Sequence, residues 1–198
     1  DLFWYRSTLA HNAPRLDGVS QPFGEAACEN FDAVGGWTWA RGSFGNLART
    51  VVAGPDYLVD VVELSAAEDR TLELPWHLGG RAEVRPAGSW EAAELPDEFV
   101  RQPERFRAAS SGPLVVRSCG TGSATLSLYL AFDGELLRAL GPGAPGSSEP
   151  VPFYVVRARG RNLRVVTVLE PATGSPVVRA VRAELRCLRR DLGLGASA

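Results

Sequence analysis

Two adjacent residues near the start of the chain, His11 and Asn12, are the first whose side chains could take part in chemistry. The turn signal Asp17-Gly18 follows them, so the pattern predicts that the imidazole lies at the rim of a sheet. An imidazole in that position can exchange a proton or bind an anionic group on a partner surface. The alternative for His11 is a rim histidine hydrogen-bonded to a turn, and the alternative for Asn12 is a turn former.

Short alternating runs bounded by glycine, proline, aspartate and serine recur along the chain, and helical periodicity is almost absent. This pattern predicts an all-β protein of roughly ten or more antiparallel strands, stacked as a two-sheet β-sandwich. The residues in the tail at 177–192 fit either a strand or a helix, and their context favours a strand. The other strands are expected at residues 36–41, 49–52, 57–64, 71–78, 124–132, 153–159 and 163–169.

The segments between these strands are rich in turn-forming residues. Residues 54–56 and 160–162 are each expected to turn a hairpin. Alternation in the strand at residues 124–132 places Ser127 and Tyr129 on its outward face. The remaining connections are expected as a polar loop at 65–70, a long excursion with at most one helical turn at 85–111, and a surface loop at 140–152.

The composition indicates a globular domain and argues against two classes of partner. Of the 198 residues, 45% are hydrophobic and 22% are charged, and the net charge is -2, which suits one sizeable core. All 21 basic residues are arginines and they form no block, so we expect no nucleic-acid surface. No run of about 18 apolar residues and no signal-peptide pattern is present, so we expect no membrane partner.

The cysteines predict no metal cluster and no disulfide framework. Cys28, Cys119 and Cys187 are odd in number and far apart, with no Cys-x-x-Cys spacing. They are expected to be packed free thiols, and a single disulfide is the alternative.

The opening segment resembles a motif of a known family. The pattern His-Asn-x-x-x-x-Asp-Gly-x-x-Gln opens the β-sandwich domain of heparinase II/III-like polysaccharide lyases, and it is matched here by His11, Asn12, Asp17, Gly18 and Gln21. Residues 51–64, 74–78 and 153–171 are similar to later segments of that family in the same order. The resemblance covers most of the chain and implies a large two-sheet sandwich, in agreement with the strand pattern.

The resemblance implies that residues 1–198 form one β-sandwich domain of a lyase that cuts a uronate-containing acidic polysaccharide by β-elimination. A base removes the proton on C5 of the uronate and the oxygen on C4 leaves. In this family the sandwich supplies a histidine, here His11, that stabilises the developing charge at a domain interface. The base comes from an N-terminal helical toroid that is absent from this chain. The chain is therefore expected to be inactive alone and to be part of a longer protein, for which a periplasmic or secreted location is favoured.

Further residues are candidates for substrate binding. Asn12 would contact the sugar beside His11, and Trp37 and Trp39 could stack on sugar rings, although strand tryptophans more often pack. His77 is expected on the outward face of its strand, hydrogen-bonded to Glu73, with a smaller part in substrate binding.

The resemblance also bears on metal binding and leaves one alternative function open. Some relatives hold a structural metal through a histidine two residues after the catalytic one, an aspartate and a later histidine. Here the first of these positions is Ala13 and the second is at best Asp32, so no cofactor is expected and a structural zinc is the alternative.

The alternative function is a non-catalytic carbohydrate-binding or scaffold sandwich, in which the tryptophans matter and His11 does not.

Overall fold

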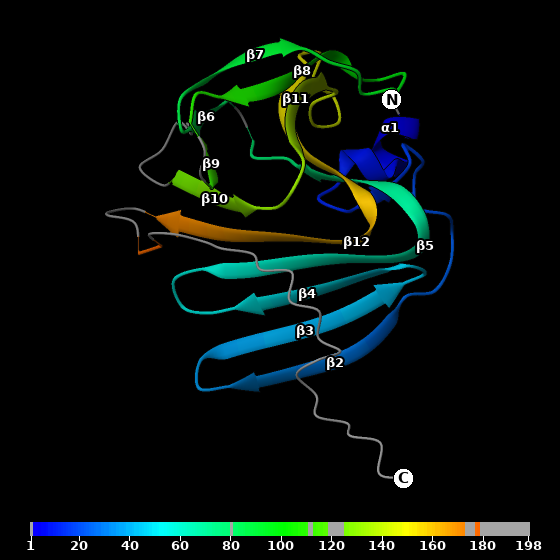
Figure 1. Cartoon of the computed structure of the whole chain (residues 1–198), viewed down its shortest axis with the longest axis vertical. Coiled ribbons are helices and arrows are strands. Elements are labelled where there is room, and N and C mark those ends of the chain that lie inside the picture. The colour runs from blue at the N-terminus through cyan, green and yellow to red at the C-terminus, as the bar shows by residue number, and fades with distance from the viewer. Residues whose placement is uncertain (1, 80, 111–112, 119–124, 173–176, 179–198) are drawn as a thin grey trace.

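Strands make up most of the part of the chain that the computed structural model describes, which is residues 2–79, 81–110, 113–118, 125–172 and 177–178 (Figure 1). The all-β prediction is confirmed. No helix within these ranges is long and apolar enough to cross a membrane. The elements are α1 (Leu2–Arg6), η1 (Thr8–Ala10), β1 (Arg15–Leu16), β2 (Ala27–Val34), β3 (Trp37–Phe44), β4 (Leu47–Ala53), β5 (Leu58–Trp76), β6 (Ala82–Arg85), β7 (Gly88–Ala92), β8 (Arg101–Ala108), β9 (Leu114–Ser118), β10 (Thr125–Ala131), β11 (Glu135–Gly141) and β12 (Val151–Ala172).

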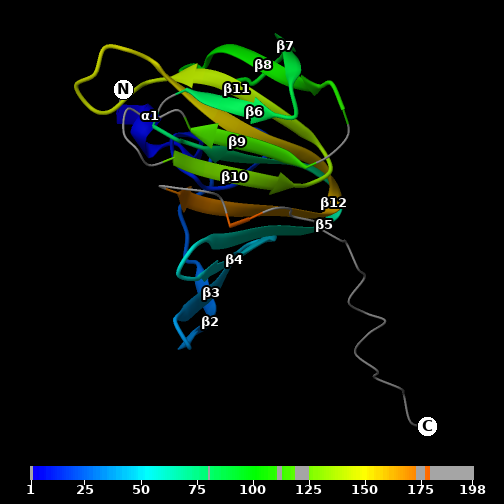
Figure 2. The same cartoon turned by 90° about the vertical axis from the view of Figure 1, so that its left-hand side faces the viewer.

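Two long strands, β5 and β12, pair with each other along most of their length and belong to both layers of the fold. The first half of β5 and the second half of β12 lie in a layer with the order β2-β3-β4-β5-β12-β10-β9-β6. The other halves of β5 and β12 lie beside β1 and β11, and β11 leads to β8 and β7. The sheet therefore folds over on itself, and Figures 1 and 2 show the two layers that result.

The hairpin predicted at residues 160–162 is wrong. Gly160 pairs with Arg70 and Asn162 pairs with Ser65, so β12 continues through the predicted turn with only a shift of register. The polar loop predicted at residues 65–70 is wrong for the same reason, because this segment is part of β5. Turn-forming residues mark a bulge at the bend here, where long-range strand pairing overrides the local preference for a turn.

Other connections agree only in part with the sequence analysis. The hairpin predicted around residues 54–56 is confirmed, because β4 pairs with β5 and the Gly54 N–H donates to the Tyr57 carbonyl at 2.9 Å. The described part of the excursion, residues 85–110, contains no helix; it holds β7 and β8, which pair with each other. In the tail, residues 179–192 lie outside the described part of the chain, so that strand stays a prediction.

The expectation of packed thiols is wrong for Cys28, because this cysteine is exposed on β2. The strand β2 is the edge strand of the first layer, and the second layer does not extend over it (Figure 1). All eight of its residues are exposed. The other two cysteines, Cys119 and Cys187, lie outside the described residues.

The apolar interior has two parts that lie on opposite faces of the second layer. The first part fills the space between the layers and includes Val62, Leu72, Leu128 and Val156. The second part lies beneath α1 and η1, and its members are Trp4, Leu9, Leu95, Leu137, Ala139, Phe153 and Val155.

The outward face predicted for Ser127 and Tyr129 on β10 is wrong, because both side chains are buried. The Tyr129 hydroxyl donates to Glu170 Oε2 at 2.8 Å. The backbone N–H groups of Val177 and Val178 donate to the same carboxylate. The chain after β12 therefore returns close to this face of β10, which the alternation pattern alone could not indicate.

A buried ion pair joins β1 to β5. Arg15 and Glu73 are directly opposite in the strand register, and they are 1% and 3% exposed. Arg15 Nε donates to Glu73 Oε2 at 2.6 Å, and Arg15 Nη1 donates to Asp97 Oδ2 at 3.3 Å. Each charge depends on its partner because neither has access to water.

We expect Glu73→Ala to lower the free energy of unfolding by about 3–5 kcal/mol, because it leaves Arg15 buried without its main partner. Urea unfolding of the purified chain measures this change. Asp69→Ala is the matched control, since it removes an exposed pair with Arg161 and should cost less than about 1 kcal/mol. A similar small loss for both variants would show that the buried pair contributes no more than a surface pair.

Candidate functional site around His11

The N-terminal segment is anchored on the second layer by apolar side chains. Trp4 and Leu9 are buried, and the Trp4 ring lies 5.9 Å from the Phe153 ring and 6.0 Å from the Phe99 ring, centroid to centroid. His11 is the first residue after η1, and its backbone N–H donates to the Thr8 carbonyl. These contacts fix the backbone from which the His11 side chain projects.

The imidazole of His11 is exposed and is held at one of its two nitrogens. Nε2 lies 2.9 Å from the carbonyl oxygen of Tyr5. A carbonyl oxygen can only accept a hydrogen bond, so Nε2 is the protonated nitrogen. Among the described residues Nδ1 has no hydrogen-bond partner. This ring can accept a proton at Nδ1 and, once protonated, can donate to an anionic group.

Asn12 is held from β4 and from the residue that follows β5. Its Oδ1 accepts from the backbone N–H of His77 at 2.8 Å, and its carbonyl oxygen accepts from Arg49 Nη1 at 2.6 Å. Arg49 is itself fixed by two bonds to the buried Asp60, at 2.6 Å and 3.2 Å. Burial raises the pKa of Asp60, and the hydrogen bonds from Arg49 oppose that rise. Asn12 therefore positions the loop that carries His11, whether or not its amide also meets a ligand.

The Asp17-Gly18 pair forms a turn that is docked on β5. Both residues have positive φ, 51° and 74°, which suits a tight turn. The Asp17 carboxylate accepts from the Thr71 N–H at 2.7 Å and from Arg70. The bond from Thr71 is the main reason that the pKa of Asp17 is lowered. The two residues thus act as a clamp between the N-terminal segment and β5.

Gln21, the last member of the motif, closes the segment on itself. Its Nε2 donates to the Pro14 carbonyl at 2.6 Å, and its backbone N–H donates to Thr8 Oγ1 at 2.7 Å. The Thr8 N–H in turn donates to Ser20 Oγ at 3.1 Å. Within the motif, His11 is left as the residue with an exposed ionisable ring.

His77 lies against the second apolar cluster, so the prediction of an outward face is wrong. Its ring stacks on Phe153 at 5.1 Å and meets the edge of Trp4 at 6.3 Å. Its Nε2 lies 2.9 Å from the Leu9 carbonyl and therefore donates to it. The alternation that predicted the outward face ends with β5 at Trp76, one residue earlier.

The hydrogen bond predicted between His77 and Glu73 is also wrong, because Glu73 pairs with Arg15. Burial lowers the pKa of His77 below its ordinary value of 6.5. Its ring is therefore neutral near pH 7, and its role in the described contacts is to join η1 to β5.

The structure does not bring Trp37 and Trp39 together with His11. Both tryptophans are half-buried on β3, and Trp39 is paired with Val52. Arg49, which contacts Asn12, lies on the opposite face of β4 from Val52, because alternate residues of a strand point to opposite faces. The Trp37 ring packs against Tyr57 at 5.5 Å. A part for these rings in sugar binding stays a prediction.

Arg49 and Asp60 are the site residues that the sequence analysis did not identify. A signal for them was present, because each charge interrupts an apolar run on neighbouring strands. Arg49 lies between Leu47 and Val51, and Asp60 lies among valines. Two opposite charges on core-facing positions of a hairpin are expected to pair.

The described residues hold no group of three or more histidine, cysteine, aspartate or glutamate side chains that could bind a metal ion. Asp32, the residue considered above for the second metal position, lies exposed on β2 and accepts a hydrogen bond from the Ala33 N–H. The expectation that no metal is needed stays a prediction.

Comparison with known proteins gives a likeness of fold. No family model and no curated protein matches the sequence. Among solved structures, a heparinase III matches at 16% identity and a TM-score of 0.59, and the match covers 87% of this chain and 25% of that chain. The heparan sulfate lyase HepC from Pedobacter heparinus matches at 15% identity and a TM-score of 0.60, with the same shares covered.

At these identities the likeness shows the fold alone. The chain spans about a quarter of the length of the structures that it matches, 25% for both. The resemblance to the β-sandwich domain of heparinase II/III-like lyases is thus supported as a resemblance of fold.

We expect His77 to make the stability of the chain depend on pH. Because its pKa is lower in the folded chain than its ordinary 6.5, the unfolded chain takes up the proton first as the pH falls. Stability is then present above pH 6.5 and is lost as the pH falls from that value towards the folded pKa. His77→Gln keeps a donor for the Leu9 carbonyl and removes this titration.

Urea unfolding at about pH 7.5 and about pH 5 measures the effect. The free energy of unfolding should fall less for His77→Gln than for the unaltered chain. His11→Gln is the comparison variant and should keep most of the steeper fall, because burial is the largest cause of the lowered pKa of His77 and the charge of His11 is a smaller one. The same pH dependence in all three proteins would contradict this assignment.

Proposed function

We propose that this chain is the β-sandwich domain of a polysaccharide lyase that cleaves a uronate-containing acidic polysaccharide by β-elimination, with His11 in the active site. The observation that carries the proposal is the His11 motif. Asn12, Asp17 and Gln21 have structural partners, while His11 is exposed and has a ring nitrogen without a partner among the described residues. The fold shared with a heparan sulfate lyase supports the substrate class.

The chemistry needs a positive charge or a strong donor beside the uronate carboxylate. The proton on C5 becomes removable only when the negative charge that develops on the carboxylate is stabilised. A base takes this proton, and the electron pair of the C5–H bond forms the C4–C5 double bond. The C4–O bond breaks, and the leaving oxygen is protonated. Protonated His11 supplies a donor at Nδ1, because Nε2 is already directed at the Tyr5 carbonyl.

The base comes from outside the described residues in this proposal. The hydroxyls of Tyr5 and Tyr154 donate to backbone carbonyls. Burial raises the pKa of Tyr129 to about 12, which makes it a poor base near neutral pH. Tyr57 packs against Trp37, on the side of the sheet away from His11. A base from a second domain agrees with the small share, 25%, of the matched lyases that this chain covers.

The partner in this proposal is a helical toroid domain of the same protein, which faces the His11 loop. The loop is suited to an interface because apolar contacts fix its backbone while the His11 ring remains exposed. Arg49 is 32% exposed and donates to the Asn12 carbonyl while its charge is paired with Asp60, so it fixes the backbone beside His11.

We expect His11→Ala, in a protein that carries this chain together with its toroid domain, to lower kcat by about 10²–10³-fold. This is the scale for removing one donor that stabilises charge in the transition state. The free energy of unfolding should change by less than about 1 kcal/mol, since an exposed ring buries little area. Steady-state kinetics on an acidic polysaccharide and urea unfolding measure the two effects.

The alternative of a non-catalytic carbohydrate-binding sandwich predicts a different pair of results. Trp37→Ala and Trp39→Ala are the matched variants, because both rings are half-exposed on β3 and lie on another face. Under the lyase proposal these variants keep kcat within about threefold, whereas the binding-module alternative makes them weaken polysaccharide retention. An unchanged kcat for His11→Ala would remove the catalytic assignment.

We also expect the 198-residue chain alone to fold and to produce no unsaturated uronate, because it supplies the charge-stabilising group and lacks the base. Absorbance of the unsaturated product at about 235 nm measures cleavage, since β-elimination creates a conjugated C4–C5 double bond. Circular dichroism confirms that the chain is folded in the same sample. Steady product formation by this chain would contradict the two-domain mechanism.

A further inference from the structure

A groove lies between the edge strand β6 and the β8–β11–β12 part of the second layer. One part of the groove has a volume of 490 Å³ and a charged and polar lining. The other part has a volume of 530 Å³ and is lined mainly by β6, the turn after it and two aromatic rings. The two parts adjoin, because Ala82 lines both.

This groove lies on the opposite face of the second layer from His11. Phe153 packs against Trp4 and His77 beneath the His11 loop, whereas the next residue, Tyr154, lines the groove. The Ala82 N–H donates to the Tyr154 hydroxyl at 3.0 Å, which fixes the start of β6 at the groove wall. Alternation along β12 therefore separates the two sites.

The charged part of the groove presents a guanidinium in a fixed orientation. Arg138 Nε donates to Glu104 Oε2 at 2.7 Å, and the Arg138 guanidinium lies 4.2 Å from the centre of the Trp90 ring. Neither terminal nitrogen of Arg138 has an acceptor within the part of the chain that the structure describes. A guanidinium held in this way can donate two parallel hydrogen bonds to a carboxylate or a sulfate group.

Two further polar side chains line the same part of the groove. Arg81 is exposed and forms no ion pair with any described residue. Gln102 has a φ of 50°, which is unusual for a residue other than glycine. It lies where the register between β8 and β11 shifts, and such irregularities re-aim side chains at binding sites. With two arginines and Glu104, the charges of this lining sum to a net positive value.

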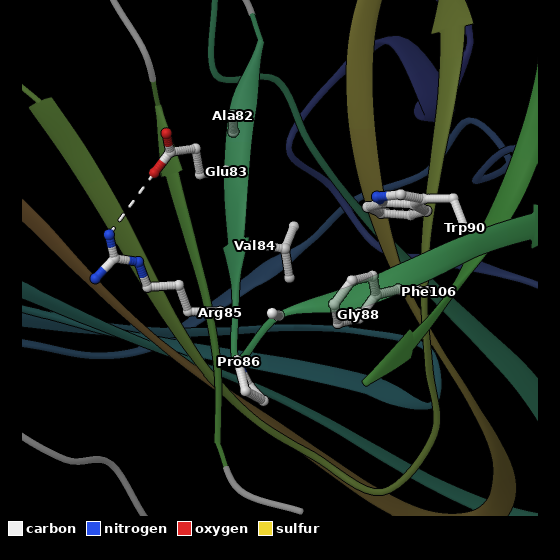
Figure 3. A pocket seen from close by; sticks show the side chains of 9 residues that line it. Ala82, Glu83, Val84, Arg85, Pro86, Gly88, Trp90 and Phe106 are labelled. Atoms are coloured by element: carbon white, nitrogen blue, oxygen red, sulfur yellow. Dashed lines mark ion pairs between the residues drawn. The ribbon is translucent and has the colours of Figure 1, made fainter. Parts of the chain in front are cut away.

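The apolar part of the groove is shown in Figure 3. The rings of Trp90 and Phe106 lie 5.0 Å apart, centroid to centroid, and Val84 projects towards them from β6. Glu83 and Arg85 pair with each other on the other side of β6, away from the rings (Figure 3). An apolar wall beside a cationic end suits a sugar chain, which has apolar C–H faces and anionic substituents.

We propose that this groove is a second saccharide-binding site, separate from His11. It binds a carboxylated or sulfated sugar unit through Arg138, Arg81 and Gln102, and the neighbouring sugar lies along Val84 and the exposed part of Trp90. The choice of an acidic polysaccharide as ligand rests on the function proposed above. The site would hold the polysaccharide on the sandwich independently of the reacting sugar.

The test is titration calorimetry of the 198-residue chain with three hexasaccharides, namely one of heparan sulfate, one of a sulfate-free polyuronate and one of neutral glucose units. We expect an acidic hexasaccharide to bind at least about tenfold more tightly than the neutral one. The tighter of the two acidic ligands then identifies the anionic group. Equal affinity for all three would overturn the proposal.

Substitutions in the groove give the second arm of the test. Arg81→Gln and Arg138→Gln should each weaken binding of the acidic hexasaccharide by about tenfold. Arg107→Gln is the matched control, since Arg107 is an exposed arginine of β8 that pairs with Glu91 outside the groove, and it should leave affinity unchanged. Gln102→Gly should weaken binding and raise the melting temperature, because glycine adopts positive φ without strain. If Gln102 served only the fold, Gln102→Gly would leave the affinity for the acidic hexasaccharide unchanged.

The groove proposal and the lyase proposal are tested by different measurements, namely the affinity of the arginine variants and the kcat of His11→Ala. Unaltered affinity in both Arg81→Gln and Arg138→Gln would overturn the groove site, while a loss of kcat in His11→Ala would still support the lyase. An unchanged kcat in His11→Ala combined with weaker binding by the arginine variants would remove the lyase assignment and support the groove.

Discussion

The backbone pairing of β5 with β12 is the interaction on which the rest of this structure depends. It runs from Tyr154 opposite Trp76 to Leu169 opposite Leu58, with one shift of register at the bend. Every other strand is attached to one half of this pair, either directly or through neighbours. A slip of one residue would send each buried side chain to the wrong face. Both apolar clusters, the His11 loop and the groove all take their positions from this register.

Two ion pairs, each with at least one buried member, hold the N-terminal segment against the paired strands β5 and β12. Arg15 reaches Glu73 within the second layer, and Arg49 reaches both Asp60 and the Asn12 carbonyl in the first. Such pairs contribute little net stability when compared with apolar residues of the same size, but they tolerate few alternative arrangements. Their consequence is that the loop carrying His11 has one position relative to both layers.

The local parts of the fold could be read from the sequence, and the long-range parts could not. Strands with clean alternation, such as β10, were found because the period of two is a local property. The bend of β12 was predicted as a hairpin because its turn-forming residues carry no sign that each half pairs with a different half of β5. His77 was placed on the wrong face because alternation says nothing about a segment from elsewhere that covers the strand end.

In the candidate site, too, the local motif could be read from the sequence and the long-range contacts could not. The motif at His11 could be read from the sequence as a candidate site, but the contacts that hold this segment come from residues far along the chain. The pairing of Arg49 with Asp60 could have been inferred from two charges in apolar strands. The groove could not have been inferred, because Arg81, Gln102 and Arg138 come from three separate segments and meet only when the layers face each other.

The sequence separations around Asn12 have a kinetic meaning. Its bonds to Arg49 and His77 span 37 and 65 residues. Closing such long loops costs conformational entropy, and a few hydrogen bonds offset this cost only once β4 and β5 have already paired. We therefore expect the His11 loop to assemble late in folding. We also expect its native position to be lost when the long strands separate, because the bonds that hold it come from β4 and from the end of β5.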